Sequence, residues 1–444
     1  MILRFFYLLT IFLRYRLYSL LPYSRAYSIL YLLAPWTIFS HKQTKAPLQE
    51  GLERMGPIFV KFGQFLSARP DLFSADVIQQ FSALQDSVSF SDHAFFQPIL
   101  KDLYDRYQII LNPSPLAAAS IAHVYSGVLP SGQQVAIKIQ RPDLERLVNQ
   151  DLKILKLFIQ IMGFFMPRRL RLLCVFKRFE NTLRHEMDFK REAAQADALK
   201  NAMKHYTDHL EIPKIYWPYI SKNILVLQRA SGVRFHTLLK LDLNASIKRK
   251  IAKKLYLIFI HSVFQQGLFH ADMHPGNIFF DFSTEKFWFV DFGIVARLDS
   301  RSHKLLCQQV VALLKRDYVS MAQAFTDGGW TPENFSVIDR QNFEWSLHML
   351  CAPWMDRKLC EISLAQIFQE MIILARTYQI RVQPEMILLQ KTLVVIEGLV
   401  RSLDPQMNLI ETGSAEVLKS VYARYGLPAK LARLLNPMAS DCVI

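Results

Sequence analysis

The segment HADMHPGNIFFDFSTEKFWFVDFG, residues 270–293, places polar side chains at the ends of short apolar runs. Asp272 and Asn277 stand five positions apart in a turn-rich loop, and Asp291 directly follows the run FWFV. Carboxylate and amide oxygens are ligands that Mg²⁺ prefers, and a loop aspartate can accept a proton from a hydroxyl group or water. The segment therefore predicts a phosphoryl-transfer site between short strands.

Upstream, the motif VAIK supplies the cation that such a site also needs. Val135, Ile137 and Ile139 alternate with Lys138, which predicts a strand with the lysine on the face opposite the valine and isoleucines. The turn PSGQ before this strand predicts a hairpin. Each fragment alone occurs by chance, but their order along the chain favours kinase-like chemistry over coincidence.

The stretch PLAAASIAHVYSG, residues 115–127, stands where a glycine-rich phosphate loop is expected. Every added Cβ takes space and restricts the backbone, so an alanine loop should hold nucleotide in a different pose. A plain turn of small residues is the alternative. The candidate nucleotide-binding residues of this loop are Ala117, Ala118, Ala119, Ser120, Ile121 and Ala122.

These motifs together resemble the UbiB family, also called ABC1 or ADCK, of atypical kinase-like proteins linked to ubiquinone biosynthesis. The likeness runs from about residue 45 to about residue 410. It includes KFGQ (Lys61, Gly63 and Gln64), AAAS, VAIK, HEMDFKREA, HADMHPGN and VDFG. The likeness to bacterial members extends to LLQKTLVVIEGLVRSLDPQ, residues 388–406, where no catalytic residue is expected.

The resemblance implies an α+β, bilobal protein-kinase-like fold. A small β-rich N-lobe and a large helical C-lobe are expected, with a helical N-terminal extension over the site. The expected segments are a basic membrane-interface segment (1–45), the helical extension (46–112), an N-lobe with a helical insert (113–232), a helical C-lobe (233–410) and a tail without the usual transmembrane pair (411–444).

The resemblance also implies roles for single residues. Lys138 would bind the phosphates of ATP or ADP, with Glu192, or in second place Glu186, as its partner. Asp272 would be the catalytic base, and Asn277 and Asp291 would bind Mg²⁺. Lys61, Gly63 and Gln64 would lay a helix across the place where a kinase admits its peptide. His123 and Tyr125 stand where the family commonly has Gln and His.

The charge balance favours a membrane surface over nucleic acid as a partner. The net charge is +15, and six basic residues and no acid precede Glu50. The apolar N-terminus predicts a helix in the headgroup layer of anionic lipids, with a core helix or a signal peptide as alternatives. A second basic, apolar stretch, residues 155–178, could extend this surface. No recognisable nucleic-acid module or long uncharged apolar run is present.

The expected protein is therefore a peripheral, membrane-associated kinase-like ATPase on the cytoplasmic face of a bacterial inner membrane. It would support ubiquinone biosynthesis by giving ring-modifying enzymes access to lipid-like quinone precursors. A nucleotide-binding scaffold and a true protein kinase are the alternatives. A rival hypothesis makes His270, Asp272 and His274 part of an oxygenase iron site. Five scattered cysteines favour a reducing compartment.

Overall fold

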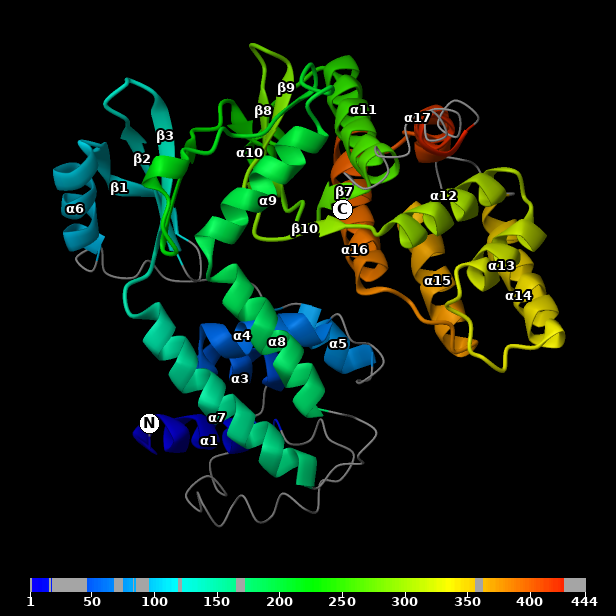
Figure 1. The fold of residues 1–444 in the computed structure, drawn as a ribbon, viewed down its shortest axis with the longest axis horizontal. Helices are drawn as coiled ribbons and strands as arrows, with labels where there is room; N and C mark the ends of the chain where they lie inside the picture. The colour runs from blue at the N-terminus through cyan, green and yellow to red at the C-terminus, as the bar shows by residue number, and fades with distance from the viewer. Residues whose placement is uncertain are drawn as a thin grey trace, which may run out of the picture. The chain divides into compact units, whose positions relative to one another are not determined.

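The computed structural model describes residues 2–15, 17, 46–67, 75–82, 84, 96–118, 122–164, 172–355 and 362–426. The chain divides into two compact units, and their elements are labelled in Figure 1. Unit 1 consists of Met1–Arg191 and Tyr216–Arg229, and unit 2 of Glu192–Ile215 and Ala230–Ile444.

Unit 1 contains the expected antiparallel sheet, in the order β1-β2-β3-β5. Its strands are β1 (Ile110–Ala118), β2 (Ala122–Val128), β3 (Gln134–Gln140) and β5 (Ile224–Gln228). Gly132 makes the predicted turn between β2 and β3 with a φ of 84°. The buried side chains Val135, Ile137 and Ile139 form a core with residues of α6 (Gln97–Tyr107). The predicted strand alternation is confirmed.

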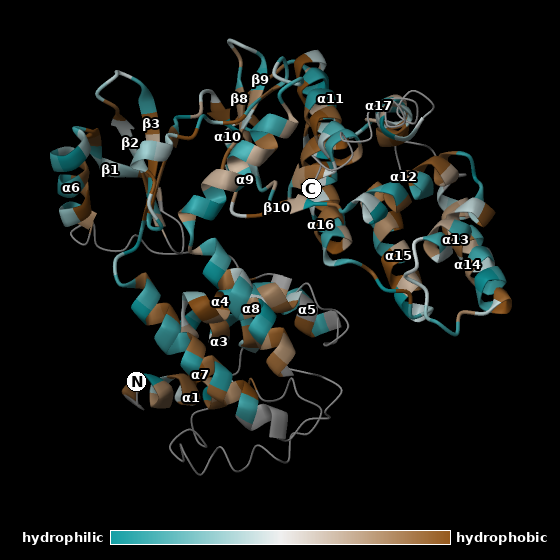
Figure 2. Ribbon diagram, in the orientation of Figure 1, coloured by the Kyte–Doolittle hydropathy of each residue, from teal (hydrophilic) through white to brown (hydrophobic). Residues whose placement is uncertain are grey.

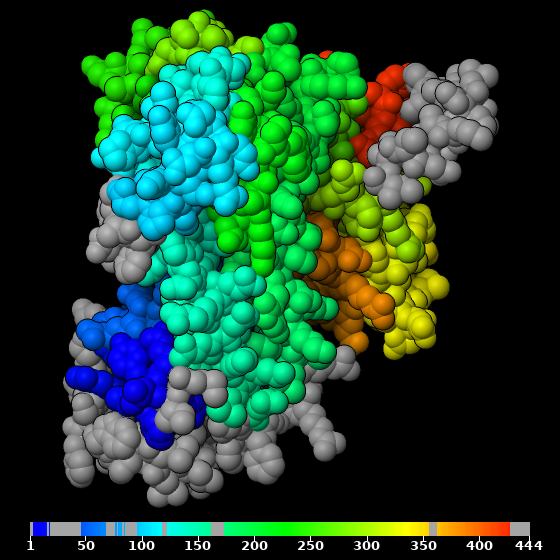
Figure 3. All heavy atoms as spheres, turned by 60° about the vertical axis from the view of Figure 1, so that its left-hand side comes forward, coloured from blue at the N-terminus to red at the C-terminus, as the bar shows by residue number. Residues whose placement is uncertain are grey.

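Helices form most of the other described residues of unit 1. Figure 3 shows α1 and α3 in blue beside the blue-green α7 and α8. The helices are α1 (Ile2–Arg14), α3 (Pro47–Met55), α4 (Pro57–Ser67), α5 (Ala75–Ser82), α7 (Leu144–Phe164), α8 (Leu172–Glu186) and the start of α9 (Phe189–Ala202).

Helix α1 packs inside unit 1, which corrects the membrane-interface prediction for its buried face. Phe12 stacks on Phe158 of α7 with ring centroids 5.6 Å apart. Arg4 donates to Asp151 at 3.0 Å and to the carbonyl of Met55 at 2.8 Å. One face of α1 is therefore part of the core of unit 1, and the membrane-interface prediction stays a prediction for its exposed face. Residues 18–45, 165–171 and 427–444 lie outside the described residues, so the membrane predictions there stay predictions.

Unit 2 is mainly helical, as expected for a kinase-like C-lobe. Its four-stranded sheet has the order β4-β9-β8-β6, and β10 pairs with β7. The strands are β4 (Leu210–Glu211), β6 (Val233–Arg234), β7 (Leu268–His270), β8 (Ile278–Asp281), β9 (Lys286–Phe289) and β10 (Val295–Arg297). The helices are α10 (Phe235–Leu238), α11 (Ala245–His261), α12 (Ser300–Leu314), α13 (Tyr318–Asp327), α14 (Val337–Met355), α15 (Leu364–Thr377), α16 (Pro384–Leu403) and α17 (Leu409–Tyr425).

Hydrophobic side chains run along α11, α15 and α16, where Figure 2 shows brown stretches. Helix α16 packs on both α11 and α15, and α11 also packs on α17. No helix among the described residues is both long and apolar enough to span a membrane.

Two features of the boundary between the units bear on the sequence predictions. Glu192–Ile215, expected in the N-lobe, packs with unit 2 because β4 pairs in parallel with β9. Ser231 and Gly232 lie just after the boundary at Arg229. Gly232 has a φ of 91°, and an added Cβ would lie 2.3 Å from the carbonyl oxygen of Phe280. Only glycine fits this position.

Acid should weaken unit 2 through His303. This fully buried side chain contacts the Tyr425 hydroxyl at 2.6 Å and the Val263 carbonyl at 3.0 Å. Burial lowers its pKa from 6.5 to about 4, so the unfolded chain binds the extra proton first as the pH falls. We expect His303 to cost about 2 kcal/mol of stability at about pH 5, relative to pH above 6.5.

The measurement is urea unfolding of the parent and of His303→Gln between about pH 7 and 5. Glutamine retains hydrogen-bonding groups but does not titrate, so the variant should show the shallower pH dependence. Parallel profiles for the two proteins would contradict this assignment.

Candidate functional site

The loop between β7 and β8 fixes Asp272 and Asn277 against each other. Asn277 Nδ2 donates to the Asp272 carbonyl at 3.1 Å and lies 3.4 Å from its carboxylate Oδ2. The backbone carbonyl of Asn277 accepts from Val290 N at 3.0 Å, which ties the loop to the end of β9. The two predicted side chains are therefore held together in unit 2.

Asp291 lies two residues after the end of β9 and has an unusual backbone conformation. Its φ of 62° is in the left-handed region, where aspartate is tolerated better than most residues. The next residue, Phe292, is buried, with its ring centroid 5.4 Å from that of His270. Uncommon backbone conformations are retained mainly where the surrounding structure enforces them, and they cluster at functional sites.

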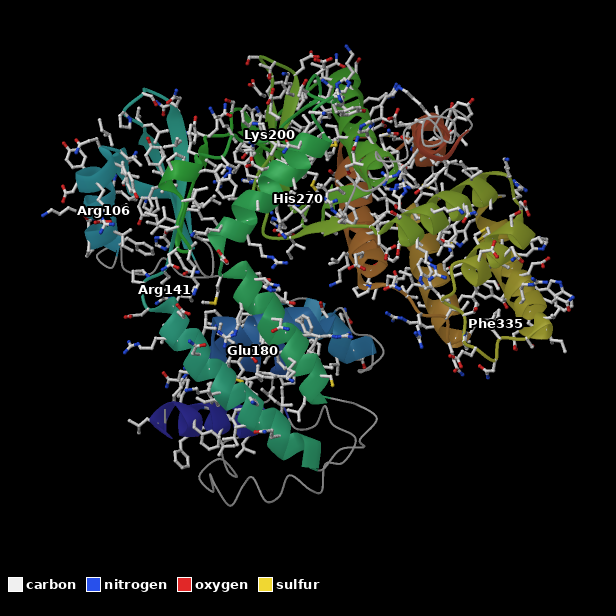
Figure 4. All side chains as sticks on the ribbon, viewed as in Figure 1. Arg106, Arg141, Glu180, Lys200, His270 and Phe335 are labelled. Atoms are coloured by element: carbon white, nitrogen blue, oxygen red, sulfur yellow. The ribbon has the colours of Figure 1, made fainter. Side chains whose placement is uncertain are left out.

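His270 organises this loop, and Figure 4 labels it at the end of β7. Its Nδ1 accepts from the backbone N–H of Asp272 at 3.1 Å, and its Nε2 donates to the carbonyl of Val290 at 3.1 Å. Burial lowers its pKa, which the nearby Asp272 and Asp291 carboxylates only partly oppose. His270 is thus a neutral positioning residue between the two aspartates.

This geometry corrects the rival iron hypothesis. A metal binds imidazole through a free nitrogen lone pair. Both ring nitrogens of His270 contact the backbone, and Nδ1 of His274 accepts from the N–H of Gly276 at 3.2 Å. Among the described residues, no group of three or more His, Cys, Asp or Glu side chains could hold a metal ion. His270 is therefore not an iron ligand.

Sequence reasoning missed one further contact of this loop. Thr392 of α16 is buried, and its hydroxyl lies 3.3 Å from the carbonyl oxygen of Ala271. The hydroxyl also lies 2.8 Å from the carbonyl of Leu388, one turn earlier in α16. The only signal in the sequence is a small polar residue directly before the apolar run LVVI of this helix. Thr392 thus connects α16 to the residue before Asp272.

The side chains of the loop fit a bound Mg²⁺ ion. Because Asn277 directs its amide nitrogen to Asp272, its oxygen Oδ1 remains as a candidate ligand. Asp291 is half-buried and adds a carboxylate. Mg²⁺ commonly takes one or two protein oxygens and completes its shell with phosphate and water. When bound, the ion would offset phosphate charge.

Most of the other predicted residues belong to unit 1, with Lys138 in the middle of β3, whereas Glu192 belongs to unit 2. Lys138 pairs with Val124 on one side and with Leu225 on the other. Its ammonium nitrogen lies 5.4 Å from the centroid of the Phe189 ring, at the start of α9. A cation over an aromatic face is attracted to it, which helps to position the ammonium group.

The described residues of the alanine loop lie at the end of β1 and at the start of β2. Ala117 pairs with Val124 and Ala118 with His123, so both alanines belong to the ladder. Ala119, Ser120 and Ile121 lie outside the described residues, and the nucleotide-binding role of the loop stays a prediction.

The two departures from the family pattern lie on the core side of β2. His123 is buried and stacks on Phe96 with ring centroids 4.2 Å apart. Tyr125 is buried in the same core, and burial raises its pKa to about 12. Side chains alternate along a strand, so both face away from the side of the sheet that carries Lys138.

The KFGQ motif joins α4 to α8. Lys61 Nζ lies 2.8 Å from Glu186 Oε2, and both side chains are largely buried, with 15% and 21% exposed. Gln64 Nε2 donates to the carbonyl of Leu84 at 3.3 Å. At Gly63 an added Cβ would lie 2.4 Å from Leu84 Cδ1, so glycine permits this close packing. The motif holds unit 1 together, and its position over a nucleotide site stays a prediction.

Glu186 thus contacts Lys61, and the pairing of Lys138 with Glu192 stays a prediction. Glu192 lies in the first turn of α9, three residues after Phe189, and only 5% of it is exposed. Burying a carboxylate is costly unless a cation or hydrogen-bond donors compensate its charge.

Removing one member of the Lys61–Glu186 pair should destabilise unit 1. Glu186→Gln retains the shape of the side chain but removes the charge, and we expect a loss of about 1–3 kcal/mol. Lys61→Met should cost a similar amount. The double variant should cost less than the sum, as a double-mutant cycle from urea unfolding can measure. Additive losses would contradict a direct interaction.

Two family models match the chain. The ABC1 atypical kinase-like domain matches residues 85–325, and the UbiB helical domain matches residues 347–408. The first match includes Lys138, Asp272, Asn277 and Asp291, and the second includes Thr392.

Curated relatives match nearly the whole chain. A probable protein kinase UbiB of Marinobacter nauticus is 34% identical over 98% of this chain and 82% of its own length. A probable protein kinase UbiB of Cellvibrio japonicus is 34% identical over 92% of this chain and 76% of its own length. The identity thus extends well beyond the short motifs.

A solved structure shows that the fold is kinase-like. The Rv3197–erythromycin complex of Mycobacterium tuberculosis matches with a TM-score of 0.53 and 18% identity, over 79% of this chain and 89% of that chain. At this identity the match concerns the fold alone. Together with the family match, it confirms the predicted α+β, kinase-like fold class.

Proposed function

Because the chain belongs to the UbiB family of atypical kinase-like proteins, we propose that it is a membrane-associated ATPase that supports ubiquinone biosynthesis. The observation that carries the proposal is the arrangement of the unit 2 loop. His270 accepts a hydrogen bond from the backbone of Asp272, and the Asn277 amide donates one to the Asp272 carbonyl. A scaffold that binds no nucleotide has no use for these oxygens or for the uncommon backbone of Asp291.

Each assigned residue has one chemical task in this proposal. Lys138 binds nucleotide phosphate, with Glu192 as its partner, and Asn277 and Asp291 bind Mg²⁺. Asp272 accepts the proton of the attacking water or hydroxyl group. The oxygen of that water or hydroxyl group bonds to the γ-phosphorus, and ADP leaves. The alanine loop restricts how closely the backbone approaches the phosphates, which favours hydrolysis over transfer to a peptide.

The short segment after Asp291 supports a small acceptor or water over a protein substrate. Strand β10 ends at Arg297, and α12 begins at Ser300. A protein kinase uses a long activation segment here to bind its peptide substrate. We propose that lipid-like quinone precursors, together with the enzymes that modify their rings, are the molecules on which the ATPase acts.

The membrane part of the proposal rests on charge and on exposed apolar side chains. The protein carries a net charge of +15. On α1, Leu3 is 88% exposed, and Phe6 and Tyr7 are also exposed. Basic and apolar groups that share one surface bind anionic headgroups and the acyl boundary. The proposed location is the cytoplasmic face of a bacterial inner membrane.

The test combines a deletion strain with the purified protein. Lys138→Ala should fail to restore the parent profile of quinone intermediates, although the variant reaches the parent protein level. The parent should hydrolyse ATP faster with anionic than with neutral liposomes. Full complementation by Lys138→Ala would overturn the ATPase role, and nucleotide binding without turnover would favour the scaffold alternative.

A further inference from the structure

A cavity of about 110 Å³ lies among the helices of unit 2. Its walls come from α11, α12, α15, α16, α17 and the short π-helix Ser262–Gln266. They are almost entirely leucine, isoleucine, valine, phenylalanine and methionine. A cavity of roughly 150 Å³ with such walls stays dry and binds benzene. The space in unit 2 is therefore suited to part of an apolar molecule, such as a small ring.

A buried glutamine side chain interrupts this apolar wall. Gln309 of α12 is only 3% exposed. Its Nε2 atom is buried and has no hydrogen-bond partner within the part of the chain that the structure describes. Leaving a buried donor unsatisfied costs about 1–3 kcal/mol, which a leucine at this position would avoid. The lining thus combines apolar surface with an unused hydrogen-bond donor.

The cavity also has an accessible rim. Val310, Leu314, Phe368, Leu393 and Ser414 line it and are each half-buried, whereas Gln309 is buried. A molecule could therefore place a ring among the apolar walls and direct a longer tail past the rim. This combination of a deep donor and an apolar entrance is typical of small-molecule sites.

The cavity is built by separate parts of the chain. Helices α11 and α12 fall within the ABC1 domain match, and α15 and α16 fall within the UbiB helical domain match. Helix α17 closes the wall through Gly413, where an added Cβ would lie 3.0 Å from the Tyr256 hydroxyl oxygen. The helical domain thus completes a pocket that the kinase-like domain alone would leave open.

We propose that this cavity binds a neutral apolar molecule with a ring and one acceptor oxygen, and that Gln309 Nε2 donates to that oxygen. A ketone, a quinone or an aryl ether meets this description. The proposal concerns a second site and does not depend on the nucleotide chemistry proposed above.

A pair of probes of matched shape tests the proposal. Acetophenone and α-methylstyrene differ only in that a carbonyl oxygen replaces a methylene group. Titration calorimetry of the full chain should give about three- to tenfold tighter binding for acetophenone, because only the ketone can accept from Gln309. In Gln309→Met, which matches the side chain in size, the preference for the ketone should be lost or reversed, because its oxygen then leaves water without finding a donor.

Two further variants keep the test decisive. Gln308→Met changes the exposed neighbouring glutamine and should keep the parent preference for the ketone. Leu393→Trp should fill the entrance and weaken both probes. Gln309→Met should also raise the melting temperature of the ligand-free protein by about 2–4 °C, since it removes the unsatisfied donor. Equal binding of the probes to the parent, or no binding of either, would overturn the proposal.

Discussion

Asp291→Asn should lower ATP hydrolysis by about 100-fold or more, while the fold remains intact. Asparagine adopts the left-handed backbone of position 291 as readily as aspartate, whereas alanine would add strain there. The substitution therefore removes one negative charge and little else. Loss of one charge-stabilising group in a pre-organised site commonly costs 10²- to 10³-fold in rate.

The measurement is steady-state hydrolysis of ATP at saturating Mg²⁺, with liposomes present. Asp281→Asn is the matched control, because Asp281 ends β8 in the same sheet and its carboxylate accepts hydrogen bonds from Ser283 and Thr284 of its own turn. The control should retain parent activity. Equal hydrolysis by Asp291→Asn and the parent would remove Asp291 from the metal site.

The arrangement of the unit 2 loop could be predicted because its contacts are local. Asp272 and Asn277 are five residues apart, and His270 reaches Asp272 across one residue. The same holds for β2 and β3, where a tight turn fixes the register that places Val124 beside Lys138. Short loops leave few geometries open, so spacing and alternation suffice.

Contacts between distant segments could not be predicted in the same way. Lys61 and Glu186 lie on different helices, and each side chain could equally face solvent. Nothing in the sequence of either helix indicates that the two side chains form an ion pair. Thr392 reaches Ala271 across 121 positions. The unsatisfied amide of Gln309 becomes visible only once several helices surround it. Periodicity identifies a buried face but not the element that covers it.

Helix α1 also shows that a sequence pattern does not identify what covers a hydrophobic face. Its arginines and large apolar residues match the pattern of an interfacial helix, and that pattern also suits a core helix. The distinguishing contact is the ion pair between Arg4 and Asp151, 147 positions away. Because Asp151 neutralises this arginine, α1 can bury Leu8, Leu9 and Phe12 without leaving an unpaired charge.

Lys138→Met should weaken the binding of MgATP by about 10- to 100-fold. Methionine retains a flexible apolar stem beside Phe189, so the main loss is the ammonium charge. Hydrogen bonds to charged groups contribute about 1.5–3 kcal/mol, which corresponds to this range of affinity. Because Glu192 is buried, removing the cation proposed to pair with it should also lower the melting temperature.

Lys222→Met is the matched control in unit 1. Lys222 is half-exposed and pairs with Glu145 at 3.0 Å, a surface contact that contributes little to stability. Titration calorimetry with MgATP should give parent affinity for the control and weak binding for Lys138→Met. If both variants bind as the parent does, Lys138 does not contact phosphate, and the nucleotide must be held by other residues. A loss of affinity in both variants would point instead to long-range attraction of ATP by the positive charge of the whole protein. Added salt would then weaken ATP binding to the parent and reduce the difference from both variants.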